Sequence, residues 1–265
     1  MEIDGKTKLY AIVADPIEQV KTPQTLNALM REKGFNGVLV PMQVAPEHLA
    51  SWFDGLRAIK NFGGLIVTVP HKQAIAKLCD EVSQAASLIG AVNVVRREPD
   101  GKMVGDILDG QGFVAGLRAN DIDPAGKRVL LAGAGGAANA IAFALAQASV
   151  TALGIYNRTP AKAEDLIQRL HQSYPGFDAT VVNADTTGYD IVVNATSLGM
   201  KEGDPLSLDV DTLSPQQVVA EIIMKPETTA LLAQAQAKGC KVHYGLPMLR
   251  SQAALMAAYV GINHA

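Results

Sequence analysis

The sequence predicts an α/β fold built on parallel sheets with helices on their faces. Three observations lead to this expectation. Short runs rich in β-branched residues alternate with helical stretches along the whole chain, which is the pattern of βαβ units. A glycine-rich stretch follows one of these runs directly in the second half. The length of 265 residues allows one large domain or two of ordinary size.

The first elements are a strand over 8–14, a helix over 22–34 and a strand over 36–44. Both strands are runs of apolar and β-branched residues. In the helix, Thr22 suits the capping position, Pro23 suits the first turn, and Gly34 suits the end. We therefore expect a strand–helix–strand unit at the start of the chain.

A helix over 46–60, a strand over 64–70 and a hairpin over 91–105 come next. In the helix, Leu49, Phe53 and Leu56 recur at helical spacing. The strand is a continuous apolar run, which is typical of a buried strand. The hairpin has Pro99, Asp100 and Gly101 at its turn.

A second unit begins near Gly126. The same alternation predicts a parallel sheet with helices on its faces. We expect strands at 127–133, 150–157, 190–196, 217–223 and 240–244, and helices at 137–148, 160–172 and 226–239.

Composition excludes several classes of function. The net charge is −3 and the isoelectric point is near 6.0, so nothing favours nucleic acid or an anionic membrane as partner. No apolar run reaches the about 18 residues of a spanning helix, and we see no secretory signal. The five histidines and two cysteines show no metal-ligand spacing. We expect a reduced, cytoplasmic protein without a metal, as a monomer or homodimer.

The glycine-rich stretch 130–140 predicts a dinucleotide site. It reads Gly133-x-Gly135-x-x-Ala138 between a strand and a helix. Gly133 permits a tight turn, Gly135 lets a pyrophosphate approach, and Ala138 keeps the helix close to the strand. The alternative is a tight turn that binds nothing.

The next strand leads into Asn157-Arg158-Thr159, where a fold that prefers NAD usually carries an acidic residue. An acid repels a 2′-phosphate, whereas a guanidinium binds it with charge-assisted bonds. NADP is therefore favoured, with Lys162 as a further positive charge. The alternative is that Arg158 and Lys162 are a solvated helix start.

Seven motifs together resemble the shikimate dehydrogenase family in order and spacing. They are "VTVPHK" (67–72), "GAVNVV" (90–95), "DGQGF" (109–113), "GAGGAANA" (133–140), "NRTPAKA" (157–163), "NATSLGM" (194–200) and "GLPMLRSQA" (245–253). The resemblance implies a substrate-binding domain over 1–109 plus 245–265 and a Rossmann-type NADP domain over 110–244. It also implies reversible NADP-dependent oxidation of shikimate to 3-dehydroshikimate.

The same resemblance assigns catalysis to Lys72 and Asp109. Lys72 follows a strand, where open α/β sheets place their ligands, and an ammonium group supplies both charge and proton to a carbonyl being reduced. The alternative for Lys72 is a surface lysine at a helix start. Asp106 is a rival to Asp109, and His71, beside Lys72, either tunes the site or begins the helix.

Further contacts carry over by motif. The resemblance implies that Thr22, Thr68, Asn93 and Gln252 bind the substrate, and that the cofactor is held by Gly133, Gly135, Gly136, Ala137, Asn157, Arg158, Thr159, Lys162, Thr196, Ser197, Met200, Gly245 and Met248. Ordinary structural roles remain open for three of the substrate-binding residues: hairpin capping for Asn93, strand formation for Thr68, and a solvent-facing side chain for Gln252.

The sequence departs from the family at the end of the substrate that carries the carboxylate. Val20 stands where the family has a serine, and Thr22 where it has a second one. Ile66, Met224 and Ile107-Leu108 replace polar positions, and Glu221 replaces an aspartate. One hypothesis is weak activity on shikimate and a preference for quinate or another cyclic polyol. The others are a carboxylate still held by Thr22 with Lys21, and an NADP sensor without catalysis.

Overall fold

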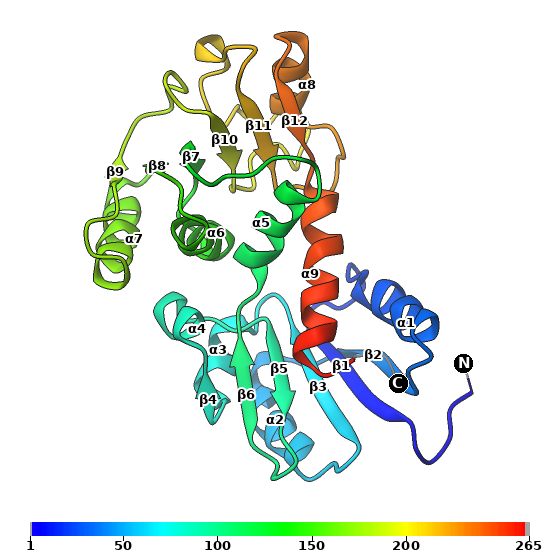
Figure 1. The fold of residues 1–265 in the computed structure, drawn as a ribbon. Helices are drawn as coiled ribbons and strands as arrows, with labels where there is room; N and C mark the ends of the chain where they lie inside the picture. The colour runs from blue at the N-terminus through cyan, green and yellow to red at the C-terminus, as the bar shows by residue number, and fades with distance from the viewer. Residues whose placement is uncertain (1, 263–265) are drawn as a thin grey trace. The chain divides into compact units, whose positions relative to one another are not determined.

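The computed structural model describes residues 2–262 and divides the chain into two compact units. The first unit is discontinuous: it comprises the residues up to Leu108 and those from Gln252 onward. The second unit is Asp109–Ser251. Each unit contains one six-stranded sheet (Figure 1). We describe each unit by itself.

The sheet of the first unit is mixed, with the strand order β2-β1-β3-β5-β6-β4. β1 is parallel to β2 and to β3, whereas β5 is antiparallel to both β3 and β6. The predicted hairpin explains this reversal, because β5 and β6 are its two arms. The elements are β1 (Lys8–Ala14), α1 (Thr22–Glu32), β2 (Gly37–Gln43), the 3₁₀ turn η1 (Pro46–His48), α2 (Leu49–Arg57), β3 (Phe62–Val67), α3 (Lys72–Leu78), β4 (Glu81–Val82), α4 (Gln84–Ile89), β5 (Val94–Arg97) and β6 (Met103–Asp106).

Two details of this unit differ from the sequence prediction. Thr22 does not cap α1: Lys21 occupies the cap position, Thr22 is the first helical residue, and no side chain caps the helix. The segment predicted as one helix over 46–60 begins as the 3₁₀ turn η1 and becomes α-helical at Leu49. The proline at position 46 and the charged residue after it suit such a tight first turn.

The sheet of the second unit is parallel throughout, with the order β12-β11-β10-β7-β8-β9. The predicted helix over 226–239 is shorter than expected, because Thr229 caps it by accepting a hydrogen bond from the Leu232 N–H at 3.2 Å. The elements are α5 (Asp109–Arg118), β7 (Arg128–Ala132), α6 (Gly136–Gln147), β8 (Ala152–Tyr156), α7 (Pro160–Ser173), β9 (Ala179–Val181), β10 (Ile191–Asn194), η2 (Val210–Thr212), β11 (Val218–Glu221), α8 (Ala230–Ala237), β12 (Lys241–His243) and α9 (Gly245–Tyr259).

Each sheet carries its own apolar core. In the first unit, β1, α1, β3 and the end of α9 contribute to one cluster of buried residues. In the second, the strands β7, β10 and β11 pack with α8 and η2 in another. The central strands are buried on both faces, as in "RVLLA" of β7, where only the first residue is exposed. This is expected for parallel strands covered by helices.

A buried histidine lies on β12, the edge strand of the second sheet. His243 on β12 is 2% exposed, and its ring meets the Phe113 ring edge-on at 6.1 Å. Its Nε2 has no hydrogen-bond partner among the described residues. Burial, with a smaller contribution from the Lys241 charge, lowers the pKa of His243 from 6.5 to about 4. The ring is therefore neutral in the folded protein at neutral pH.

We expect His243 to make the protein less stable in mild acid. Between pH 6.5 and about 4 the unfolded chain binds a proton at His243 that the folded protein does not, so the free energy of unfolding falls as the pH falls through this window. The loss amounts to about 3 kcal/mol by the lower end. Urea unfolding at pH 7 and pH 4.5 measures it. His243→Leu should flatten the pH dependence relative to wild type, whereas His48→Leu, at an exposed site, should leave it unchanged. Parallel curves for wild type and His243→Leu would contradict the assignment.

Candidate functional site

The chain that follows β3 is tied to the segment before β5 by main-chain hydrogen bonds. The Thr68 N–H donates to the Val13 carbonyl at 3.1 Å, and the Val92 N–H donates to the Lys72 carbonyl at 3.0 Å. The Val67 N–H donates to the Asn93 carbonyl at 2.8 Å. The structure therefore brings together Thr68, Lys72 and Asn93, three of the predicted site residues, at the carboxyl end of β3.

Asn93 anchors the segment that leads to Asp109. It is 1% exposed, and its side-chain Oδ1 accepts a hydrogen bond from the Leu108 N–H at 2.9 Å. Its own N–H donates to the Asp106 carbonyl at 2.9 Å. An amide that holds two neighbouring strands is poorly replaced by any apolar residue, so Asn93 has a structural role whatever else it contacts.

The two candidate aspartates differ in their surroundings. Asp106 ends β6, where Oδ1 accepts hydrogen bonds from the Ser83 hydroxyl and from the Ile107 N–H. Asp109 is buried and opens α5 in the second unit, where the positive end of the helix dipole favours a carboxylate. The Asp106 oxygen is thus engaged locally, and Asp109 keeps its place as the candidate.

His71 fixes the start of α3. Its ring is buried, and Nε2 lies 2.8 Å from the Val44 carbonyl oxygen. The His71 N–H also donates to the Thr68 carbonyl at 2.9 Å. These contacts tie the turn before Lys72 to the chain that follows β2, so the residue begins the helix and holds it in place.

Three of the apolar replacements lie in one cluster. Ile66 and Leu108 are buried members of the apolar core of the first unit, and Val20 packs against it. Thr22, at the start of α1, is half-buried, and Gln252 of α9 is 9% exposed. Met224 lies in the second unit, where its side chain is 54% exposed. The changes thus do not form a single surface within either unit.

The glycine turn of the second unit has the geometry of a phosphate site. Gly133 has φ +117°, and a Cβ there would lie 3.0 Å from the Ala195 carbonyl oxygen, so this position requires glycine. Gly135 and Gly136, at the start of α6, are exposed, and a Cβ on either would meet no atom within 4 Å. Protein packing does not explain these two glycines, but a pyrophosphate seated against the helix N-terminus does. The residues therefore fit a dinucleotide.

The turn after β8 presents its cations to solvent. Arg158, Thr159 and Lys162 are exposed. The Asn157 side chain donates to the Thr159 carbonyl at 2.8 Å, which closes the turn before α7. Both positive charges therefore lie just after the carboxyl end of β8, next to the strand that leads into the glycine turn.

The remaining predicted cofactor residues fall on three segments. Thr196 is half-buried and hydrogen-bonded within the loop after β10, while Ser197 and Met200 on the same loop are exposed. Ala137 is half-buried in the first turn of α6. Gly245 and Met248 are buried in the first turn of α9.

Sequence reasoning missed a polar relay beneath the glycine turn. The Asn139 amide donates to the carbonyls of Ala134 at 3.0 Å and Gly135 at 2.7 Å. Its oxygen accepts from Arg169, which also contacts Asp165. Only the Asp165–Arg169 spacing of four residues is visible in the sequence. The relay turns these carbonyls toward Asn139, and the first N–H groups of α6 have no acceptor within the helix, so these N–H groups can bind a ligand.

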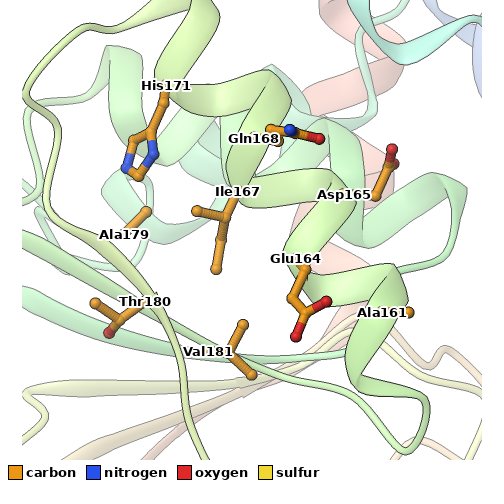
Figure 2. A pocket seen from close by; sticks show the side chains of 9 residues that line it. All are labelled: Ala161, Glu164, Asp165, Ile167, Gln168, His171, Ala179, Thr180 and Val181. Carbon is orange, nitrogen blue, oxygen red and sulfur yellow. The ribbon is translucent and has the colours of Figure 1, made fainter.

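A groove between α7 and β9 is not part of this constellation. It has a volume of about 560 Å³, and Figure 2 shows the side chains around it. None of the predicted site residues lines it. Its lining residues are Ala161, Glu164, Asp165, Ile167, Gln168, His171, Ala179, Thr180 and Val181.

Residues 2–262 contain neither a membrane-spanning helix nor a cluster of metal ligands. No helix in this range combines the length and the apolar character needed to cross a membrane. Within the same range, no three side chains of the His, Cys, Asp and Glu types gather as they would around a metal ion.

Two family models match the chain. Residues 12–95 match the shikimate dehydrogenase substrate binding domain. Residues 117–200 match the shikimate / quinate 5-dehydrogenase model. The first range contains the Thr68–Lys72–Asn93 arrangement, and the second contains the glycine turn and the cations after β8.

Individual relatives agree along nearly the full length. The shikimate dehydrogenase (NADP(+)) of Rubrobacter xylanophilus is 40% identical over 254 residues, which covers 94% of this chain and 89% of the relative. The shikimate 5-dehydrogenase of Listeria monocytogenes, solved with shikimate and NAD, is 32% identical with a TM-score of 0.92, over 100% of this chain and 95% of that one. The ligand-free 5-ketofructose reductase of Gluconobacter sp. strain CHM43 is 31% identical with a TM-score of 0.90, over 98% and 95%.

Proposed function

Because the chain belongs to the shikimate dehydrogenase family of oxidoreductases, we propose that it catalyses the reversible NADP-dependent oxidation of shikimate to 3-dehydroshikimate. The observation that carries this proposal is the placement of Thr68, Lys72 and Asn93 at the end of β3, where main-chain hydrogen bonds join them to Val13, Val92 and Val67 respectively. All three lie inside the range that matches the family's substrate-binding model. We assign substrate binding to the first unit and NADP binding to the second.

In this proposal Lys72 exchanges a proton with the hydroxyl that is oxidised. When bound, the cofactor accepts a hydride from the carbon atom. Lys72 takes the hydroxyl proton in oxidation and returns it to the carbonyl oxygen in reduction, where its positive charge also stabilises the oxyanion. Asp109 is its proposed partner. Thr68, Asn93 and Gln252 orient the ring hydroxyls, and the hydroxyl and amide groups of these residues suit that task.

The preference for NADP rests on the residues after β8. Relatives do not decide it, because the Rubrobacter enzyme is named for NADP and the Listeria structure holds NAD. Here no acidic side chain stands at Asn157 to Thr159, and Arg158 and Lys162 are both exposed. Two solvent-accessible cations favour a ligand with a 2′-phosphate.

A second candidate is a dehydrogenase for quinate or another cyclic polyol. The observation that favours it is the apolar cluster of the first unit, which includes Ile66 and Leu108 and packs against Val20. All three stand where the family usually has a polar residue, and Val20 takes the place of a serine that binds the carboxylate in the family. Each hydrogen bond lost from a buried carboxylate costs about 1–3 kcal/mol. A chain that lacks two of them should bind shikimate about 30-fold more weakly or worse.

Initial rates decide between the two candidates. We expect NADP reduction with shikimate at a KM within the ordinary range of about 1 μM–1 mM. A KM for shikimate far above this range, with faster turnover of quinate or an uncharged cyclic polyol, would favour the second candidate. Binding of NADP without turnover of any of these alcohols would favour a sensor.

The variant Val20→Ser tests whether Val20 lies at the carboxylate end of the substrate. If Val20 lies at the carboxylate end, the new hydroxyl should lower the KM for shikimate and leave the KM for an uncharged polyol unchanged, because only the former offers a carboxylate. Equal effects on both substrates would place Val20 away from the carboxylate.

A further inference from the structure

Glu221 is a carboxylic acid enclosed at the end of β11. It is 0% exposed, and its Oε1 accepts a hydrogen bond from the Asn194 amide at 2.9 Å. Its Oε2 has no hydrogen-bond partner among the described residues. Burial raises the pKa of Glu221, and hydrogen bonds from Asn194 and Thr229 offset part of this rise.

The Asn194 side chain organises the loop after β10. Its Nδ2 also donates to the Leu198 carbonyl at 3.0 Å, while its Oδ1 accepts from the Thr196 N–H at 3.1 Å and from the Thr196 hydroxyl at 2.7 Å. The Thr196 hydroxyl in turn accepts from the Leu198 N–H at 3.0 Å. One amide thus closes the whole turn over residues 194–198.

Glu221 fixes which way that amide points. β10 and β11 pair Asn194 directly with Glu221, so the Oε1 atom of Glu221 faces the Nδ2 atom of the Asn194 amide. With Nδ2 held there, Oδ1 faces the two donors of Thr196. A rotated amide would present oxygen to oxygen at Glu221 and nitrogen to the Thr196 N–H, which loses several bonds at once.

The loop in turn supports the glycine turn. The Ala195 N–H donates to the Ala132 carbonyl at 2.9 Å. A Cβ at Gly133 would lie 3.0 Å from the Ala195 oxygen and 3.3 Å from Thr196 Cγ2. There is no room between the two segments, so a displaced loop displaces the turn.

We propose that Glu221 is a positioning residue for dinucleotide binding: it orients the Asn194 amide, which shapes residues 194–198 against the glycine turn. Glu221 acts through Asn194 and does not touch the ligand. The inference rests on the proposed function for the identity of that ligand.

Binding of NADP⁺ without substrate, measured by titration calorimetry, tests the proposal. Glu221→Leu removes the acceptor and should raise the Kd about tenfold. Glu221→Gln keeps an acceptor oxygen and the size of the side chain, so its Kd should stay within about twofold of wild type. The matched control is Gln217→Leu. Gln217 is also buried, but it precedes β11 at the opposite end and donates to the carbonyls of Thr186 and Tyr189, so its loss should cost stability and leave the Kd unchanged.

A double-mutant cycle separates positioning from general damage. Asn194→Ala breaks the same bond as Glu221→Leu, so the double variant should bind NADP⁺ no more weakly than Asn194→Ala alone. Additive losses would overturn the proposal, as would a Glu221→Leu protein that binds like wild type, or a Glu221→Gln protein as weak as Glu221→Leu. If Glu221→Leu does not fold, Glu221→Met takes its place in the cycle.

The outcomes stay distinct from those of the proposed function. If the wild-type protein binds NADP⁺ but does not oxidise shikimate, the proposed reaction is wrong, and the binding measurements still decide the role of Glu221. If the wild-type protein oxidises shikimate normally and Glu221→Leu binds NADP⁺ like wild type, only the proposed role of Glu221 is wrong.

Discussion

Replacing Lys72 with methionine should lower kcat for shikimate oxidation by about 10³-fold or more, because the variant has no group to exchange the proton or to stabilise the oxyanion. Methionine keeps the length of the side chain and favours a helix, so α3 should still begin at this residue. The Kd for NADP⁺ should stay near the wild-type value, since Lys72 belongs to the other unit than the glycine turn.

The control for Lys72→Met is Lys77→Met. Lys77 lies on the same helix and is exposed, so this change removes an equal charge away from the turn after β3 and should leave kcat unchanged. Stopped-flow rates at saturating substrate, measured from pH 6 to pH 10, give the readout. Retention of more than about a tenth of wild-type kcat by Lys72→Met would argue against general acid–base catalysis at this residue.

Replacing Arg158 with leucine should weaken NADP⁺ binding by about 10- to 100-fold and leave NAD⁺ binding nearly unchanged. A charge-assisted hydrogen bond contributes about 1.5–3 kcal/mol, and only NADP carries the 2′-phosphate that receives it. The ratio of the two Kd values is therefore the quantity to measure, because a general disturbance of the fold would weaken both cofactors together.

Lys127→Leu is the matched control for Arg158→Leu. Lys127 is also exposed, but it precedes β7 and so lies at the amino end of the parallel sheet. Loss of its charge should leave both Kd values unchanged. Raising the salt concentration should reduce the effect of Arg158→Leu, since exposed charges are screened. Equal weakening of NADP⁺ binding and NAD⁺ binding would show that Arg158 does not determine the cofactor preference.

Much of the fold was visible in the sequence because its parallel strands are short apolar runs. The strand over 8–14 is predicted to the residue, and the alternation identifies most of the second sheet. Helix starts were less visible. The Pro226 segment resembles a helix start, but Thr229 supplies the cap three residues later. The short α3 and α4 were not predicted, because helices of seven and six residues depend on packing more than on their own propensity.

The candidate site was predicted as a set of positions, not as a set of contacts. The motif Gly133-x-Gly135 carries its own geometry, since a positive φ and an open helix end follow from the residue type. Glu221 acts through a hydrogen bond to Asn194, 27 positions away, and Asn139 is linked to Arg169, 30 positions away. No local pattern encodes such partners, so these residues become visible only when neighbouring elements are placed.

The division of the chain has a consequence for its synthesis. The first unit is discontinuous: its apolar core includes Met256 and Ala257 from the end of α9 and Val260 just after it, and the Tyr10 hydroxyl donates to the Val260 carbonyl. The second unit is a single stretch of chain. On the ribosome, the first unit must therefore wait for the residues from Gln252 onward, while the second unit completes its sheet earlier. The nascent chain should thus complete its second unit before its first, with the strands of the first unit exposed to chaperones until residues 252–262 have emerged.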